Sequence, residues 1–122
     1  MSHAAQLGFP TTRTQATLER NAVRQESNVW SPAANEKVTA AAFPYYRNGK
    51  LVNIKYRGPN KTFWQVKGAE KILYGLDDIV NQDWIIIVEG ELDKLALEEA
   101  GFQNVVSVPD GAPVKVHTTR RL

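Results

Sequence analysis

A short apolar run at residues 84–88 constrains the fold of this chain more than any other feature of its sequence. The run is continuous and mostly β-branched, which is typical of a parallel strand that is covered on both faces. Leucine and alanine then recur at helical spacing over residues 92–100, and Gly101 stands where a left-handed helix C-cap belongs. A second strand is predicted at residues 104–108. The order strand, helix, strand predicts a βαβ unit, which is right-handed almost without exception.

A small antiparallel meander is predicted upstream of this unit. Asn48-Gly49 is the strongest short-range sign of a tight hairpin, and residues 58–61 predict a second turn. These turns separate three predicted strands, at residues 43–46, 51–57 and 62–67. Because side chains alternate along a strand, we expect Lys55 and Arg57 on a basic face that lies opposite an apolar one.

The remaining residues predict little regular structure. Short helices are expected at residues 15–25, 69–74 and 76–80. We expect four segments: an N-terminal arm, partly helical or disordered and poorly packed (1–37), a basic subdomain (38–80), the βαβ unit (81–112) and a divergent or disordered tail (113–122). The predicted fold class is α+β combined with α/β, in which a small antiparallel basic β-meander is followed by the βαβ unit of an incomplete α/β domain.

Charge is segregated along the chain, although the net charge is only +2. Residues 47–71 contain seven Lys or Arg and one acid, whereas residues 77–101 contain eight Asp or Glu and one base, Lys94. The first stretch suits a polyanion, and the second suits metal ions or protons. The chain has no cysteine, which excludes disulfides and a cysteine-ligated zinc site. No apolar run approaches the roughly 20 residues of a membrane span, and no secretory signal is visible, so we expect an intracellular protein without a membrane partner.

Three carboxylates follow the apolar run within five residues, at Glu89, Glu91 and Asp93. Glu89 comes directly after the predicted strand and before Gly90, which places it at the carboxyl edge of the sheet, where open α/β folds bind their ligands. Acids in a first helical turn also complement the helix dipole, so Asp93 has an equally good structural explanation. Glu89 is the stronger functional candidate, because a charge next to a buried strand costs stability unless solvent, a cation or a partner uses it.

The run at residues 86–96, Ile-Ile-Val-Glu-Gly-Glu-Leu-Asp-Lys-Leu-Ala, resembles the first motif of TOPRIM domains, an apolar strand followed by Glu-Gly and an Asp three residues beyond the glycine. Lys-Ile-Leu-Tyr-Gly-Leu precedes it at residues 71–76, and Val-Val-Ser-Val-Pro-Asp-Gly-Ala follows at residues 105–112. Together these segments resemble the TOPRIM primases of phage-type primase-helicases and of the organellar Twinkle family. The resemblance covers about residues 38–113. It implies the N-terminal primase subdomain, followed by the first half of a Rossmann-like TOPRIM domain only.

The resemblance also implies roles for individual residues. Glu89 matches a catalytic glutamate of primer synthesis that acts near the magnesium site or in proton transfer, and Glu91 and Asp93 would support the site or the local fold. Lys55, Arg57 and Lys71 would bind the template strand and nucleotide phosphates, and Trp64 could stack on unpaired bases. Other readings stay open, since Lys55 and Arg57 are also typical of a solvated strand face, and Trp64 and Phe63 of a core.

The sequence departs from this family pattern in three places. A TOPRIM site needs a later Asp-x-Asp pair for its metal ions, but no Asp or Glu follows Asp110, so we expect a truncated or divergent end. The cysteines of the family's zinc module are missing, and so is the Gly-rich phosphate loop of a helicase. We therefore expect magnesium and no zinc, and no helicase activity in this chain.

Two functions of different classes follow. The first is a DNA replication protein related to DNA primase, a nucleotidyltransferase acting on single-stranded DNA with ribonucleoside triphosphates, in which a helicase or the rest of a primase-helicase would be the protein partner. The second is a noncatalytic module that binds single-stranded nucleic acid. Another TOPRIM enzyme, such as a topoisomerase, a recombination protein or a nuclease, fits the segment at residues 71–76 less well. The family implies a mitochondrion or chloroplast, or else a phage or bacterial cytoplasm.

Overall fold

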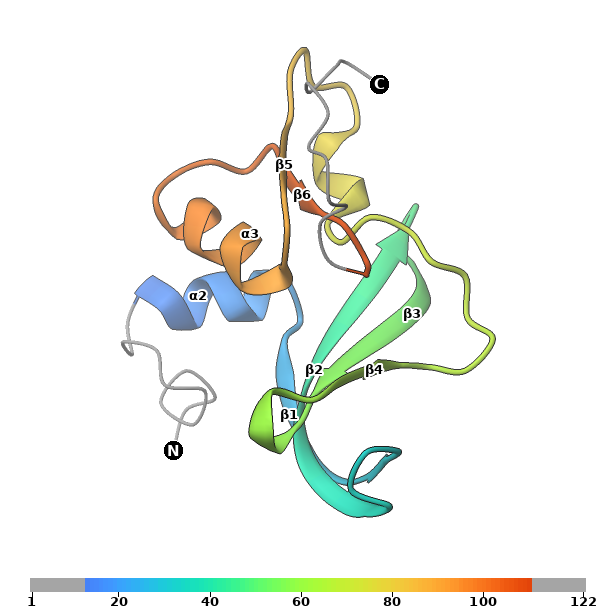
Figure 1. Cartoon of the computed structure of the whole chain (residues 1–122). Helices are drawn as coiled ribbons and strands as arrows, with labels where there is room; N and C mark the ends of the chain where they lie inside the picture. Colours follow the sequence, from blue (N-terminus) through green and yellow to red (C-terminus); the bar gives the residue numbers. More distant parts are fainter. Residues whose placement is uncertain (1–12, 111–122) are drawn as a thin grey trace. The chain divides into compact units, whose positions relative to one another are not determined.

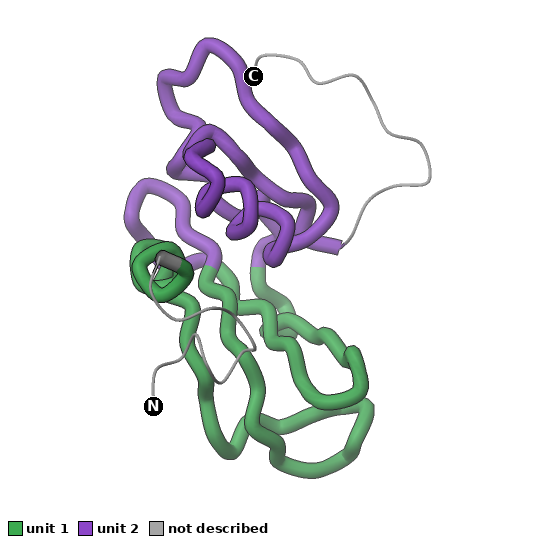
Figure 2. The backbone as a smooth tube through the Cα atoms, turned by 90° about the vertical axis from the view of Figure 1, so that its left-hand side faces the viewer, with its two compact units in different colours: residues 1–44, 53–69 green, residues 45–52, 70–122 purple. Residues whose placement is uncertain are grey.

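Two sheets of opposite type organise residues 13–110, the part of the chain that the structure, a computed structural model, describes (Figure 1). The elements in chain order are α2 (Arg13–Arg20), β1 (Arg24–Ser31), β2 (Glu36–Arg47), β3 (Lys50–Arg57), η1 (Pro59–Lys61), β4 (Phe63–Gln65), η2 (Leu76–Ile79), β5 (Ile86–Val88), α3 (Glu91–Glu99) and β6 (Val105–Ser107). They form two units, coloured separately in Figure 2. In the described part of the chain, unit 1 holds residues 13–44 and 53–69, and unit 2 holds residues 45–52 and 70–110.

The four-stranded sheet has the order β1-β2-β3-β4, in which β1 pairs with β2 and β3 with β4 in antiparallel register. Asn48 and Gly49 join β2 to β3 with φ angles of 51° and 76°, the left-handed pair that a tight hairpin turn requires. The predicted hairpin is therefore confirmed. Both carboxylate oxygens of Asp77 accept hydrogen bonds at this turn, from the Asn48 N–H at 2.7 Å and the Gly49 N–H at 2.9 Å.

Strand β1 was not predicted, and it corrects the expectation of a poorly packed N-terminal arm. The helix expected at residues 15–25 is α2, which ends at Arg20 because Ala22 adopts a left-handed φ of 57°. The chain then continues as β1, whose Arg24 pairs with Ala42 of β2. Leu18 and Val23 are 2% and 5% exposed, so this segment contributes to a core.

The core of unit 1 is built from small and aromatic residues of β2 together with α2 and the residues after it. Its buried apolar members are Leu18, Val23, Ala40, Ala41, Ala42 and Phe43. Five successive residues of β2 are therefore buried between positions 40 and 44, so this strand is covered on both faces there.

Unit 2 contains the predicted βαβ arrangement. Strand β5 pairs with β6 in parallel, with Ile87 opposite Val106, and α3 connects them. Gly101 follows the helix with φ 111°, its N–H bonds to the Glu98 carbonyl at 2.9 Å, and the Phe102 N–H bonds to the Leu97 carbonyl at 3.0 Å. This pattern is a Schellman motif, which confirms the expected glycine C-cap. No helix within residues 13–110 is long and apolar enough to span a membrane.

Two predictions for unit 2 were wrong. Strand β5 is not covered on both faces, because Ile87 is 39% exposed and Trp84, just before the strand, is 59% exposed. The helix expected at residues 69–74 does not form, since Tyr74 instead makes an antiparallel bridge to Ser107 at the outer side of β6. The helical turn expected at residues 76–80 is present as η2.

Candidate functional site

Glu89 lies in unit 2, between the end of β5 and the start of α3. It follows Val88, the last residue of the strand, and its side chain is exposed. Gly90 is the N-cap residue of α3, with φ −141° and ψ 165°, and makes no side-chain capping hydrogen bond. Glu89 is therefore placed at the carboxyl edge of a parallel strand pair, as the sequence predicted. It also lies near the positive end of the helix dipole.

The two acids that follow Glu89 have different environments. Glu91 is 4% exposed, and its carboxylate accepts a short hydrogen bond from the Tyr45 hydroxyl. Tyr45 is fully buried, and this burial together with the neighbouring Glu91 carboxylate raises the pKa of its phenol far above the ordinary range. Asp93 is exposed, and a β-carbon added to Gly90 would lie 3.7 Å from its Oδ2 atom. Asp93 therefore lies at the same turn as Glu89, whereas Glu91 is engaged within the core.

The arrangement of carboxylates bears on whether magnesium fits this site. Within residues 13–110 no three His, Cys, Asp or Glu side chains are grouped so that they could hold a metal ion. A complete two-metal site is thus not formed by the described residues alone. Magnesium in nucleotide enzymes is often held by only one or two carboxylates together with waters and phosphates. Glu89 can supply one such carboxylate.

A buried lysine fixes the helix that follows Glu89. Lys94 is 0% exposed, and its ammonium lies 2.7 Å from Asp78 Oδ2 and 2.7 Å from Glu98 Oε1. It also lies 5.9 Å from the centre of the Tyr74 ring. A β-carbon at Gly75 would lie 2.7 Å from Lys94 Cε, and Gly75 has a left-handed φ of 82°, so only glycine leaves room for the lysine. These contacts connect α3 to the segment at residues 74–78, close in sequence to the predicted ligand Lys71.

This buried cluster was not predicted from the sequence. We expected leucine and alanine to form the inner face of the helix, but its buried residues are Glu91, Lys94, Leu95 and Glu98. The spacing of these four residues is helical, and the Lys94–Glu98 pair is separated by four positions. Charged residues at helical spacing more commonly form a solvated helix face, so this pattern did not by itself predict burial.

Lys55 and Arg57 lie on β3 in unit 1, next to β4. The Lys55 ammonium is 5.4 Å and the Arg57 guanidinium carbon 5.9 Å from the centre of the Phe63 ring. The apolar and basic faces differ from expectation, because Asn53 and Lys55 are only 2% and 8% exposed. Phe63 is 52% exposed and is therefore not a core residue.

Trp64 and Lys71 complete the set of predicted ligands. Trp64 is half-buried and stacks on Tyr56, with ring centres 5.6 Å apart and an interplanar angle of 25°. Lys71, in unit 2, is exposed and forms an ion pair with Asp110 at 3.0 Å. Lys55 and Arg57 thus lie on β3 and Trp64 on the neighbouring strand β4 of unit 1, and Glu89, Asp93 and Lys71 belong to unit 2.

Comparisons with known proteins identify both relatives in sequence and similar solved structures. The chain is 53% identical over 103 residues to the Twinkle homolog protein, chloroplastic/mitochondrial, of Arabidopsis thaliana, and 54% identical over 100 residues to the Primase homolog protein of the same plant. These matches cover 84% and 82% of this chain but only 14% and 28% of the two relatives. No family model matches the chain.

One of the similar structures is the primase fragment of the Bacteriophage T7 primase-helicase protein. The TM-score is 0.61 and the sequence identity 22%, over 80% of this chain and 39% of the phage chain. At this identity the likeness concerns the fold, and it agrees with a mixed α/β chain that has an antiparallel sheet and a small parallel one.

Proposed function

This chain belongs to the family of primase and Twinkle homologues, and we propose that it has a primase-like role in DNA replication in which it binds single-stranded DNA. The observation that carries this proposal is the position of Glu89, an exposed carboxylate between a parallel strand and a helix N-terminus. In the TOPRIM interpretation of unit 2, this carboxylate is the catalytic group of nucleotidyl transfer. The chain spans less than a third of either relative, so primer synthesis is proposed for this segment together with the rest of a primase.

The chain's own residues would divide the work as follows. Lys55 and Arg57 bind phosphates of the template strand, because neutralising phosphates is the main source of affinity for single strands. Lys71 binds nucleotide phosphates, exchanging its surface contact with Asp110 for them. Glu89 would hold magnesium with the phosphates and waters, and the ion would neutralise charge on the transferred phosphoryl group. Asp93 and Glu91 support the turn and the helix that position Glu89.

A noncatalytic single-strand-binding module is the second candidate, and two observations favour it. Glu91 is buried against Tyr45, and no group of three metal-binding side chains exists in residues 13–110. In this alternative the basic strands bind nucleic acid, and the βαβ unit only completes the fold. An organellar location is proposed in both cases, since one relative is named chloroplastic/mitochondrial.

Magnesium-dependent primer synthesis separates the two candidates. The full chain would be joined to the rest of a primase, which supplies the remaining metal ligands, and given single-stranded DNA, ribonucleoside triphosphates and magnesium, with Glu89→Gln as the test variant and Glu36→Gln as the matched control. Glu36 is an exposed glutamate on β2 in unit 1. Primer formation that Glu89→Gln abolishes and Glu36→Gln preserves supports the enzyme. Salt-sensitive DNA binding without primer formation supports the binding module, and absence of both rejects the two candidates together.

A further inference from the structure

Phe63 is an exposed aromatic residue with two cations close to its ring, and it has no role in the functions considered so far. Its ring is 52% exposed, with Lys55 and Arg57 both within 6 Å of the ring centre. We propose that Phe63 stacks on an unpaired base of a single-stranded nucleic acid while the half-buried Arg57 binds the adjoining phosphate and Lys55, which is only 8% exposed, contributes its positive charge next to the ring. This inference rests on the proposed function and assigns the base-contacting residue of its DNA-binding surface.

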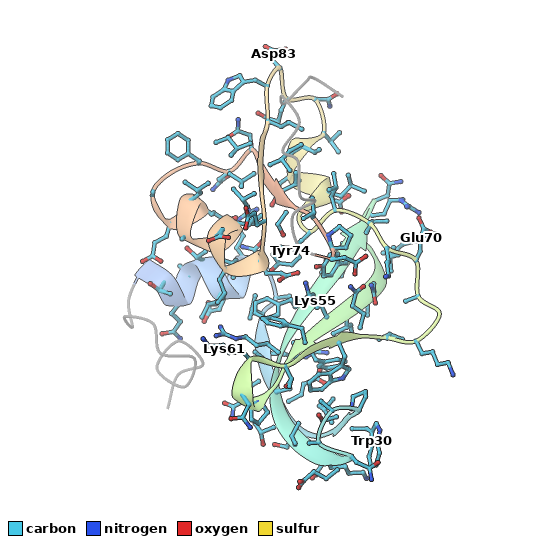
Figure 3. The ribbon with its side chains drawn as sticks, in the orientation of Figure 1. Trp30, Lys55, Lys61, Glu70, Tyr74 and Asp83 are labelled. Carbon is cyan, nitrogen blue, oxygen red and sulfur yellow. The ribbon has the colours of Figure 1, made fainter. Side chains whose placement is uncertain are left out.

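Strand register places the three side chains together. Arg57 pairs directly with Phe63 across the β3–β4 ladder, and Lys55 pairs with Gln65, two residues further along. Residues at these positions share one face of the sheet, because side chains alternate along each strand. The same face carries an amide pair, in which Asn53 Nδ2 donates to Gln65 Oε1 at 2.7 Å. Figure 3 labels Lys55, which lies on β3, and Lys61, which lies in η1 before β4.

The chemistry of this face selects the class of ligand. An exposed aromatic ring alone could bind a cation, but two positive charges already lie over the Phe63 ring and would repel another. A flat, apolar surface that is covalently joined to an anion complements both the ring and the charges. Bases linked by phosphates have this composition, and stacking on an aromatic ring tolerates every base.

The neighbouring aromatic residues do not offer the same surface. Trp64 points to the opposite face of β4, stacks on Tyr56, and lies so close to Gly58 that a β-carbon there would be 2.7 Å from Trp64 Cζ3. We therefore expect Trp64, the stacking candidate in the sequence, to act in packing. Trp30 is 53% exposed on β1 and pairs with Lys37 across the sheet. Among the described residues, however, its ring has no pair of cations over it such as Phe63 has.

The test compares Phe63→Ala with Trp30→Ala, since the two parent side chains are equally exposed and lie in the same unit. Binding of the full chain to a labelled oligothymidylate, and to an abasic oligonucleotide of the same length, would be measured by fluorescence anisotropy. We expect Phe63→Ala to weaken oligothymidylate binding by roughly five- to hundredfold and to leave abasic binding unchanged. Phe63→Tyr and Trp30→Ala should both bind oligothymidylate with the wild-type affinity.

Several outcomes would overturn the inference. If wild-type protein binds oligothymidylate and Phe63→Ala binds equally well, the base contact is wrong and the proposed DNA-binding function survives. An equal loss for both oligonucleotides would mean that Phe63 only supports the cations. If wild-type protein binds neither oligonucleotide at low salt, the proposed function fails with it. Circular dichroism of each variant excludes unfolding as the cause, and retained binding by Phe63→Tyr guards against the same artefact.

Discussion

Replacing Lys94 by methionine should destabilise unit 2 more than any other single lysine substitution in its described part. The lysine is fully buried, and its two partners differ in exposure: the side chain of Glu98 is 4% exposed and that of Asp78 is 19% exposed. Asp78 can turn toward water when the ammonium is removed, but Glu98 would keep a charge in the core. Removing one partner of a buried ion pair costs about 3–5 kcal/mol, and we expect the lower end because water can replace the ammonium at Asp78.

The measurement is urea unfolding followed by circular dichroism. With an m-value of about 1–3 kcal/mol per molar urea, a loss of about 3 kcal/mol lowers the midpoint by roughly 1–3 M. Lys50→Met is the matched control, because Lys50 is exposed at the hairpin turn, and its effect should stay within about 0.5 kcal/mol. A Lys94→Met midpoint equal to that of the control, with an unchanged m-value, would refute the reasoning.

A double variant tests the cause of the loss. Replacing both members of a buried pair by apolar residues of similar volume is often nearly neutral. Lys94→Met combined with Glu98→Leu should therefore be more stable than Lys94→Met alone. If the second substitution adds a further loss, the cost comes from packing around the Lys94 stem and not from the buried charge of Glu98.

Three further predictions concern glycine geometry and pH. Gly75→Ala should lower the free energy of unfolding by about 2 kcal/mol or more, because the added β-carbon meets Lys94 Cε at a left-handed φ. A loss below about 0.5 kcal/mol in urea unfolding would contradict this. Burial raises the pKa of Tyr45, so the stability that depends on its protonated phenol is complete below the ordinary pKa of 10.0 and declines as pH rises above it. The check is alkaline unfolding followed through tyrosinate absorbance, in which Tyr45→Phe should lack this part of the decline. Arg47 lowers the pKa of Glu70 from 4.5, so the ion pair between them is complete above pH 4.5 and is lost as pH falls through the lowered pKa. A titration followed by carbon NMR should show that the pKa of Glu70 rises in Arg47→Met.

Sequence reasoning was most accurate where the signal is local. Asn48-Gly49 determines its own backbone conformation, and the glycine after α3 closes the helix within a few residues, so both features were predicted. The alternation of strand and helix over residues 84–108 likewise predicted the βαβ unit with small errors at its ends. The position of Glu89 between β5 and α3 was also predicted, because it follows directly from this local order.

Features that depend on long-range pairing were missed. Strand β1 exists because β2 is long enough to pair with it, and no periodicity at residues 24–31 indicates this. The burial of Lys94 depends on Asp78, Gly75 and Tyr74, which come from another segment of the chain. Phe63 and Trp64 are adjacent and chemically alike, and only the register of β4 with β3 distinguishes the exposed ring from the stacked one.

The path of β2 and β3 through both units has a practical consequence. The chain passes from one unit to the other at residues 44–45, 52–53 and 69–70, so neither unit is encoded by one uninterrupted stretch of codons. Expressing residues up to 69 alone would leave the Asn48-Gly49 turn without Asp77, whose carboxylate accepts hydrogen bonds from both backbone N–H groups of the turn. Dissection of this protein is therefore better done by point substitution than by cutting the gene.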